Sequence, residues 1–250
     1  MTEFTPFASF LGGTLIGLAA VLLMALHGRI AGMTGILSGL IPPAAPDWTW
    51  RLAFLAGAVA APALITGFGG YAIPFQSDVP APWLVVGGLI VGIGVHFGAG
   101  CPSGHGVCGI ARLSRRSITA TLVFMASTAV TVFVVRHVLG GLINPAKVQN
   151  FFDLAGTWDP SLAFVMAGAL LVTFVGYRLV LKRPAPVFDT SFHLPAKKQL
   201  DLPLLAGAAT FGIGWGITGF CPGGSIPALG LAEPSALIFI AAMVVGIALA

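Results

Sequence analysis

The sequence predicts an all-α protein, a polytopic helix bundle that crosses a membrane. Of its 250 residues, 57% are hydrophobic and only 8% are charged, whereas soluble domains carry about 25% charged residues. The mean hydropathy is +0.98, and the apolar residues fall into runs of roughly 20, the length that a spanning helix needs. Two of these runs contain the same glycine-rich Cys-Pro segment. We therefore expect an inverted repeat with two broken helices that meet near the membrane midplane.

The first apolar stretches predict two spans with a short element between them. Residues 8–26 are apolar and uncharged, and the residues before them lack the basic region and cleavage site of a signal peptide. Residues 53–73 predict the second span. Residues 30–41 are too few to cross comfortably and predict a re-entrant or interfacial helix. Because this element either crosses or turns back, the sequence predicts seven to nine membrane elements in all.

The next apolar stretch predicts a broken helix. It runs from Leu84 to a Cys-Pro pair, and a second short helix is expected from Ser103 to Arg112. Pro102 donates no backbone hydrogen bond and pushes Cys101 out of the helical region, so Cys101 is expected at an extended point between two half-helices. Irregular backbone is tolerated at membrane depth only where protein or a water-filled cavity satisfies it. The sequence therefore predicts a cavity at this break.

The second part of the chain predicts two plain spans, a polar stretch and a second broken helix. The plain spans are expected at residues 117–139 and 160–181. Residues 178–201 carry too many charges to cross, and residues 203–231 repeat the broken pattern before a last span at 235–250. Two spans separate the two main clusters of basic residues. Both clusters are therefore expected on one side of the membrane, which the positive-inside rule makes the cytoplasmic side.

The two broken units are copies of each other. If both cross the membrane, they cross in opposite directions, which makes the chain a single membrane domain with one half at 1–140 and the other at 141–250. Six residues match when 120 is added to the residue number: Gly92, Ile93, Gly94, Cys101, Pro102 and Gly104 match Gly212, Ile213, Gly214, Cys221, Pro222 and Gly224.

The Cys-Pro segments are the candidate substrate site. A half-helix that begins after each cysteine would point its positive N-terminus at the cavity, which favours an anion. A thiol is a weak donor and a soft, polarizable group, suited to an anion that contains sulfur. Glycine lets a substrate approach the backbone, and serine can cap a helix or donate to an oxyanion. The expected substrate-binding residues are Cys101, Pro102, Ser103, Gly104, His105, Cys221, Pro222, Gly223, Gly224 and Ser225.

Other residues of the repeated segments have simpler interpretations. The glycines that precede the cysteines, such as Gly94 and Gly214, are expected to permit close helix packing. Cys108 has no counterpart in the second segment, where Ala228 takes its place, and is expected to pack as a small hydrophobic residue. Since the three cysteines include no Cys-x-x-Cys pair, we expect free thiols.

A soft-metal site is the alternative use of the first segment. His96, Cys101, His105 and Cys108 form a His-x4-Cys-x3-His-x2-Cys pattern of ligands that soft metals prefer. The second segment has glycine and serine at the two histidine positions, so only one half could supply ligands. We therefore expect neither a metal nor a cofactor.

The charged residues favour a path for anions. All 8 acidic residues lie outside the apolar segments, which argues against a proton symporter driven by buried carboxylates. Arg29, Arg112, Arg115 and Arg116 either draw anions to the mouth of the path or orient the chain and contact lipid headgroups. Because the basic residues lie between apolar segments, we expect membrane lipids and no nucleic acid as partners.

Three stretches of the chain resemble the YeeE/YedE family of membrane proteins linked to thiosulfate and sulfur transport: HGRIAGMTGIL, GAGCPSGHGVCGIARLSRRS and FGIGWGITGFCPGG. The resemblance covers nearly the whole chain, which looks like two short paired members joined in one polypeptide. It implies a transporter, not an enzyme, that takes up thiosulfate across the bacterial inner membrane along cysteines, two of which map onto Cys101 and Cys221. A third cysteine of larger members, just after a Gly-Arg motif, does not map, because Ile30, Ala31 and Gly32 follow Arg29 here.

The resemblance also implies a partner, a small cytoplasmic sulfur-carrier or rhodanese-like protein. Three other functions stay open. The chain could be a membrane sulfurtransferase or thiol-redox enzyme with a cysteine of lowered pKa, a soft-metal permease, or a structural membrane subunit without transport activity.

Overall fold

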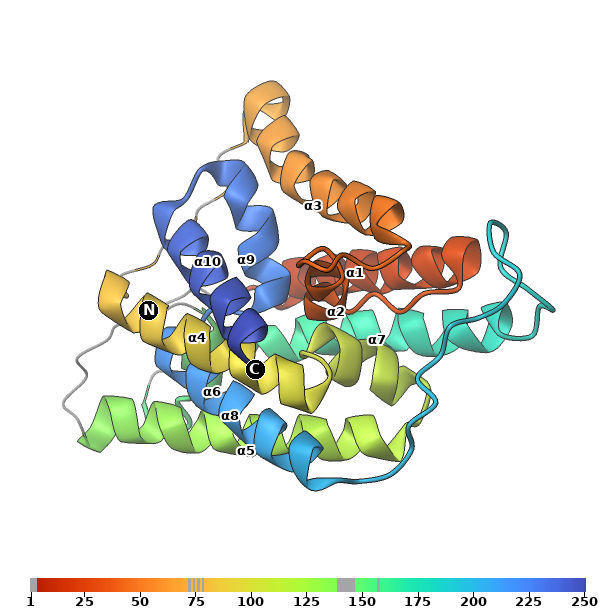
Figure 1. The fold of residues 1–250 in the computed structure, drawn as a ribbon. Coiled ribbons are helices and arrows are strands. Elements are labelled where there is room, and N and C mark those ends of the chain that lie inside the picture. Colours follow the sequence, from red (N-terminus) through yellow and green to blue (C-terminus); the bar gives the residue numbers. More distant parts are fainter. Residues whose placement is uncertain are drawn as a thin grey trace.

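The computed structural model describes residues 4–71, 73, 75, 77, 79–138, 147–156 and 158–250, and every regular element in this part of the chain is a helix (Figure 1). Five of these helices are long and apolar enough to cross a membrane, or six if one bent pair counts as a single span. This confirms the predicted all-α membrane helix bundle. The predicted boundary between the two halves, at residues 140 and 141, lies outside the described residues.

The first three helices follow the prediction with one shift. Helix α1 (Pro6–His27) is the first span, and α2 (Met33–Ser38) is the short helix expected within residues 30–41. Helix α3 (Trp48–Gly69) begins before residue 53. Asp47 and Arg51, one helical turn apart, form an ion pair at 2.9 Å that stabilises a polar first turn ahead of the apolar residues. The helix ends before residue 73, at a left-handed Gly70.

Both predicted breaks are present. Helix α4 (Ala81–Gly98) is followed by the short π-helical segment η1 (Ser103–Gly109), and α8 (Leu202–Thr218) by α9 (Pro222–Ala228) and the 3₁₀ turn η3 (Leu229–Leu231). The second pair bends by 48°. Left-handed residues end the first helix of each pair, Ala99 after α4 and Gly219 after α8.

The remaining helices complete the bundle. Helix α5 (Arg115–Phe133) continues as η2 (Val134–Val138), so the predicted span at 117–139 is confirmed up to its last residue, which is not described. Helix α7 (Ser161–Val180) confirms the next span, and α10 (Pro234–Leu249) is a shorter apolar helix of 16 residues. The sequence did not predict α6 (Lys147–Phe152), which precedes α7.

The central contact of the bundle lies between α4 and α8, which run in opposite directions (Figure 1). Gly94 faces Phe211, and Gly214 faces Val91; Gly98 faces Gly207, and Gly87 faces Thr218. These contacts form two equivalent pairs related by the 120-residue shift. The contact between residues 94 and 211 corresponds to the one between residues 214 and 91, and the contact between residues 98 and 207 to the one between residues 218 and 87. Correspondingly, α10 packs on α4 and α5 packs on α8.

Glycines hold these helices close together. A Cβ atom at Gly92, Gly94, Gly212 or Gly214 would lie less than 3.0 Å from an atom of the facing helix. The expectation that these glycines serve packing is confirmed, and it matches the use of small residues where membrane helices approach closely.

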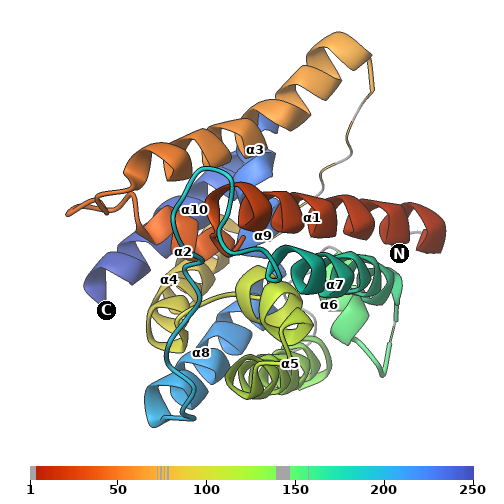
Figure 2. The ribbon, with the colours of Figure 1, turned by 90° about the vertical axis from the view of Figure 1, so that its right-hand side faces the viewer.

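A polar strap, residues 184–201, crosses one end of the bundle. In Figure 2 it rises from α7 over the end of α1 and descends to α8. Its backbone nitrogens at Val187, Phe188 and His193 donate to the carbonyl oxygens of Ala25, Leu26 and Gly28, respectively, at 2.8–3.0 Å. Arg116, in the first turn of α5, pairs with Asp201 at 2.8 Å. The two basic clusters therefore lie on one face of the bundle, as predicted, and this is called the basic face below.

Candidate functional site

Cys101 and Cys221 occupy equivalent places at the two breaks. The carbonyl of Cys101 accepts a hydrogen bond from the backbone nitrogen of His105 at 2.9 Å, and that of Cys221 accepts one from Ser225 at 2.9 Å. Each cysteine therefore precedes a short helix. Cys221 is extended, with φ −89° and ψ 132°, the backbone form that a following proline favours.

Helix α2 brings the two breaks together. The thiol of Cys101 is 1% exposed and lies 3.1 Å from the hydroxyl of Ser103, which also accepts the backbone N–H of Met33 at 3.1 Å. On the other side, a Cβ at Gly223 would lie 3.9 Å from both Cys221 Sγ and Met33 Cγ. We call Cys101, Ser103, Met33, Gly223 and Cys221 the sulfur cluster.

Sequence reasoning missed Met33. Met33 stands in HGRIAGMTGIL, one of the stretches that carry the family resemblance, but its residue type and spacing gave it no role. It becomes part of the cluster only when α2 packs against η1 and α9, more than 60 residues away. A thioether is a soft and adaptable group, like the thiols beside it. The cluster therefore holds three sulfur atoms from three different segments.

The other predicted site residues have different surroundings. Gly104 packs on Gly32, so that a Cβ at Gly104 would lie 3.7 Å from the Gly32 Cα, while Gly224 faces open space. Pro102 and Pro222 are buried. Ser225 is also buried and donates its hydroxyl hydrogen to the carbonyl of Cys221 at 2.9 Å, so this hydroxyl stabilises the start of α9.

His105 ties helices together. Its Nε2 lies 3.0 Å from the carbonyl oxygen of Gly98 and its Nδ1 lies 3.1 Å from the hydroxyl of Ser117. A carbonyl only accepts, so Nε2 carries the hydrogen and Nδ1 accepts from Ser117. Both ring nitrogens are thus engaged between the end of α4 and the start of α5, and neither joins the sulfur cluster.

The soft-metal pattern is not assembled. Among the described residues, no group of three or more His, Cys, Asp or Glu side chains could hold a metal ion. His96 stacks edge-on against Phe97, and Cys108 is 1% exposed in an apolar cluster that includes Met24 and Tyr177. The expectation that Cys108 packs as a hydrophobic residue is confirmed.

Two cavities flank the first break, as the sequence predicts. One, of about 220 Å³, is lined by residues that include Thr34, His96 and Gly100. The other, of about 360 Å³, opens on the basic face and is lined by residues that include Arg112 and Gly104. Both contain Gly35, Ala99 and Gly100 in their walls.

At the second break, a side chain of the protein, not a cavity, satisfies the free backbone carbonyl groups. Gln149 of α6 donates its side-chain nitrogen to the carbonyl oxygens of Gly216 and Ile217, at 2.8 and 2.9 Å, in the last turn of α8. Its side chain also packs against Gly219. The two breaks therefore differ, because the first borders cavities and the second is covered by α6.

Comparison with known proteins adds a family and several relatives. Residues 120–250 match DUF6691, described as a family of unknown function. Two proteins of Xylella fastidiosa strain Temecula1, both described as probable transporters, are 46% and 43% identical to this chain over 109 and 121 residues. The alignments cover 43% and 48% of this chain, and 74% and 88% of the respective relatives. No solved structure matches.

Proposed function

The chain belongs to the DUF6691 family and is an integral membrane protein, and from this premise we propose that it transports a small sulfur-containing anion, thiosulfate first among them, across the bacterial inner membrane. The relatives from Xylella fastidiosa are described as probable transporters, which supports transport as the class of function. The descriptions name no substrate, so the choice of anion rests on the chemistry of the site.

The sulfur cluster is the observation that carries the proposal. Helix packing alone gives no reason to place two cysteines of equivalent repeat position beside one methionine at the breaks of two helices. Soft sulfur groups make favourable contacts with a sulfane sulfur, and thiols donate weak hydrogen bonds to its oxygens. A bound anion would replace Ser103 as the hydrogen-bond partner of the Cys101 thiol and then move on toward Cys221.

The packing of the halves supports an inverted repeat, with its halves at 1–140 and 141–250. Each contact between α4 and α8 has an equivalent contact at positions shifted by 120 residues, and the two helices run in opposite directions. Transporters built from such repeats bind their substrate at the repeat interface between discontinuous helices. The sulfur cluster takes Cys101 from one proposed half and Cys221 from the other, which supports a substrate site between the halves. The basic face would be cytoplasmic, where a sulfur-carrier or rhodanese-like protein could receive the anion.

Uptake of radiolabelled thiosulfate into proteoliposomes tests the proposal. The purified protein is compared with the variant Cys101→Ala/Cys221→Ala, which is expected to lose at least about tenfold of the initial rate, the effect of hydrogen bonds to a charged group. Cys108→Ala is the matched control, because it removes a buried thiol outside the cluster, and it should retain uptake. Full uptake by the double variant would remove the thiols from the mechanism.

A sulfurtransferase is the second candidate, and the partial exposure of Cys221 favours keeping it. In that reaction the thiolate attacks the sulfane sulfur of thiosulfate, the S–S bond of thiosulfate breaks, and sulfite leaves while the cysteine becomes a persulfide. Cys221→Ser separates the two functions, because a hydroxyl can still donate a hydrogen bond but cannot form a persulfide. Mass spectrometry after incubation with thiosulfate would detect the added sulfur atom.

A further inference from the structure

The larger cavity is lined by three arginines and a histidine from four segments of the chain. Arg29 lies between α1 and α2, Arg51 is in the first turn of α3, Arg112 follows η1, and His193 belongs to the strap. No acidic residue is among the described residues that form its wall. Segments far apart in the sequence therefore bring three guanidinium groups and one imidazole ring to the same cavity of about 360 Å³.

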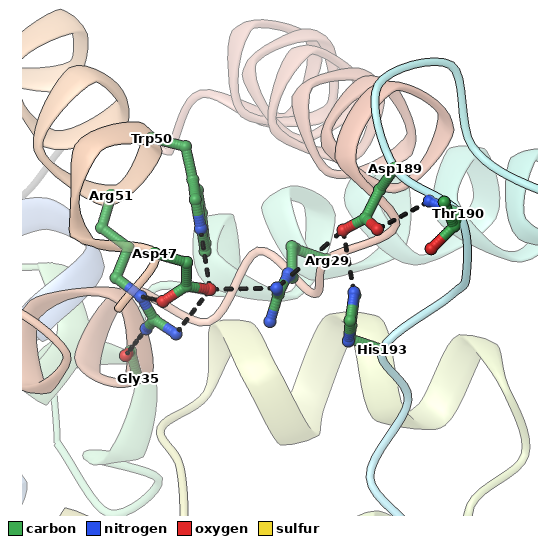
Figure 3. Close-up of polar contacts among 8 residues, drawn as sticks. All are labelled: Arg29, Gly35, Asp47, Trp50, Arg51, Asp189, Thr190 and His193. Atoms are coloured by element: carbon green, nitrogen blue, oxygen red, sulfur yellow. Dashed lines mark hydrogen bonds and ion pairs between the residues drawn. The ribbon is translucent and has the colours of Figure 1, made fainter. Parts of the chain in front are cut away.

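The positive charge around this cavity is only partly compensated. Asp47 forms ion pairs with Arg29 at 3.0 Å and with Arg51 at 2.9 Å (Figure 3). Asp189 lies 2.8 Å from His193 but 3.9 Å from Arg29. Arg112 donates to the carbonyl of Cys108 at 3.3 Å and forms no carboxylate ion pair among the described residues. Three guanidinium groups thus face two carboxylates.

The arginines are held in place before any ligand arrives. Arg51 also donates to the carbonyl of Gly35 at 2.8 Å, and the guanidinium groups of Arg29 and Arg51 lie 5.9 and 5.0 Å from the ring of Trp50. The hydrogen bond from Arg51 is the main cause that lowers the pKa of Asp47 to about 2, so this carboxylate stays charged at neutral pH. Fixed donors bind an anion without the cost of ordering flexible side chains.

The cavity also reaches the first break. Gly100 and Gly104, which lie on either side of Cys101 and Ser103 in the sequence, form part of its wall. A water molecule occupies about 30 Å³ in the liquid, so the space accommodates a small oxyanion together with water. An anion held here would lie directly outside the sulfur cluster.

We propose that the arginine-lined cavity is a second anion-binding site, which concentrates a small divalent oxyanion on the basic face beside Cys101. It binds by charge and hydrogen bonds, so it takes sulfate and thiosulfate alike, and discrimination between them belongs to the sulfur cluster. The inference rests on the proposed function in its choice of anion. A lipid phosphate has related chemistry, but His193 and Pro195 of the polar strap form one wall, which favours an anion from solution.

Equilibrium binding of radiolabelled sulfate and thiosulfate to the full-length protein in uncharged detergent tests this site. Arg112→Gln is expected to weaken the binding of both anions by about tenfold or more, the effect of a lost charged hydrogen-bond partner. Arg115→Gln is the matched control, because Arg115 is exposed and does not line the cavity, and its affinity should change less than about twofold. Equal affinity in these two variants would overturn the proposal.

Arg112→Lys shows whether the loss of affinity in Arg112→Gln comes from the lost charge or from a change in folding. It keeps the positive charge and is expected to retain most of the affinity, whereas equal losses in Arg112→Lys and Arg112→Gln would show that charge is not what binds. Phosphatidylglycerol added at a molar excess should leave sulfate bound; complete displacement would assign the site to lipid headgroups instead. A preference for thiosulfate over sulfate of more than about tenfold would contradict binding by charge alone.

The same binding measurement in the background Cys101→Ala/Cys221→Ala separates this inference from the proposed function. The arginine-lined cavity does not include either cysteine, so binding that depends on Arg112 should persist there. If the native protein takes up no thiosulfate while this binding persists, the cavity stands and the transport proposal falls. Loss of binding in the double-cysteine background would overturn the separate site.

Discussion

At the scale of single residues, sequence reasoning located the cysteines but not what surrounds them. The Cys-Pro pair identifies Cys101 and Cys221 because proline has a local and strong effect on the backbone. Met33 and Gln149 carry no such local signal, and they gain their places only through packing across the chain. His105 stands beside the break in the sequence, yet Gly98 and Ser117 take both of its nitrogens.

His105 is expected to matter for stability first. Replacing it with alanine leaves the carbonyl of Gly98 and the hydroxyl of Ser117 without their partner in a buried place, which costs about 1–3 kcal/mol for each unsatisfied group. Thermal unfolding of the purified His105→Ala variant in detergent should therefore show a clearly lowered apparent Tm. His96→Ala is the comparison, and a Tm loss as large as that of His105→Ala would contradict the specific role of these two hydrogen bonds.

At the scale of the elements, the breaks and the short α2 were predictable, while the pairing of helices was not. The spanning helices are apolar on all sides, so no amphipathic pattern marks the face that packs inward. Glycines give a better signal, as they do along α4 and α8. Helix α3 contains glycines too, yet only 6% of its membrane window is buried. Glycine alone therefore does not identify a contact.

This contrast gives a paired prediction. A side chain at Gly94 would strike the backbone of Phe211, which cannot move away cheaply, whereas Gly57 on α3 has nothing within 4 Å of an added Cβ. Gly94→Val is expected to destabilise the protein by at least about 1–3 kcal/mol, the usual effect of overpacking. Thermal unfolding should show a large fall in apparent Tm for Gly94→Val. The account of the α4–α8 contact fails if Gly57→Val lowers the Tm as much.

At the scale of the whole molecule, charge is distributed between two faces. The basic face joins the end of α1, the start of α3, the end of η1 and the strap. The count of spans correctly predicted that the two basic clusters, the one after η1 and the one in residues 178–201, share a face. Arg29 lies near Asp189 of the strap, and Arg116 pairs with Asp201. These long-range pairings could not be predicted, because polar loops leave many arrangements open. Arg136, in η2 beyond the far end of α5, pairs instead with Asp153.

The ion pairs of the basic face predict a dependence of stability on pH. Hydrogen bonds, chiefly from Arg51, lower the pKa of Asp47 from 3.8 to about 2. Because the folded pKa lies below the unfolded one, the stabilisation is complete above about pH 4 and is lost as the pH falls through about 2. The difference in apparent Tm between the native protein and Asp47→Asn should therefore stay constant from pH 7 to pH 5. A difference that shrinks within this interval would contradict the role of Asp47.

The central claim is that a sulfur-containing anion occupies the sulfur cluster, and protection of Cys221 from alkylation tests it most directly, because it uses the native protein. Cys221 is partly exposed, whereas Cys101 and Cys108 are buried. Purified protein is treated with N-ethylmaleimide, with and without thiosulfate, and modification of each cysteine is followed by mass spectrometry. The account predicts that thiosulfate slows alkylation of Cys221 and that sulfate at equal concentration protects it much less. Equal alkylation rates in thiosulfate, in sulfate and in buffer would contradict the account.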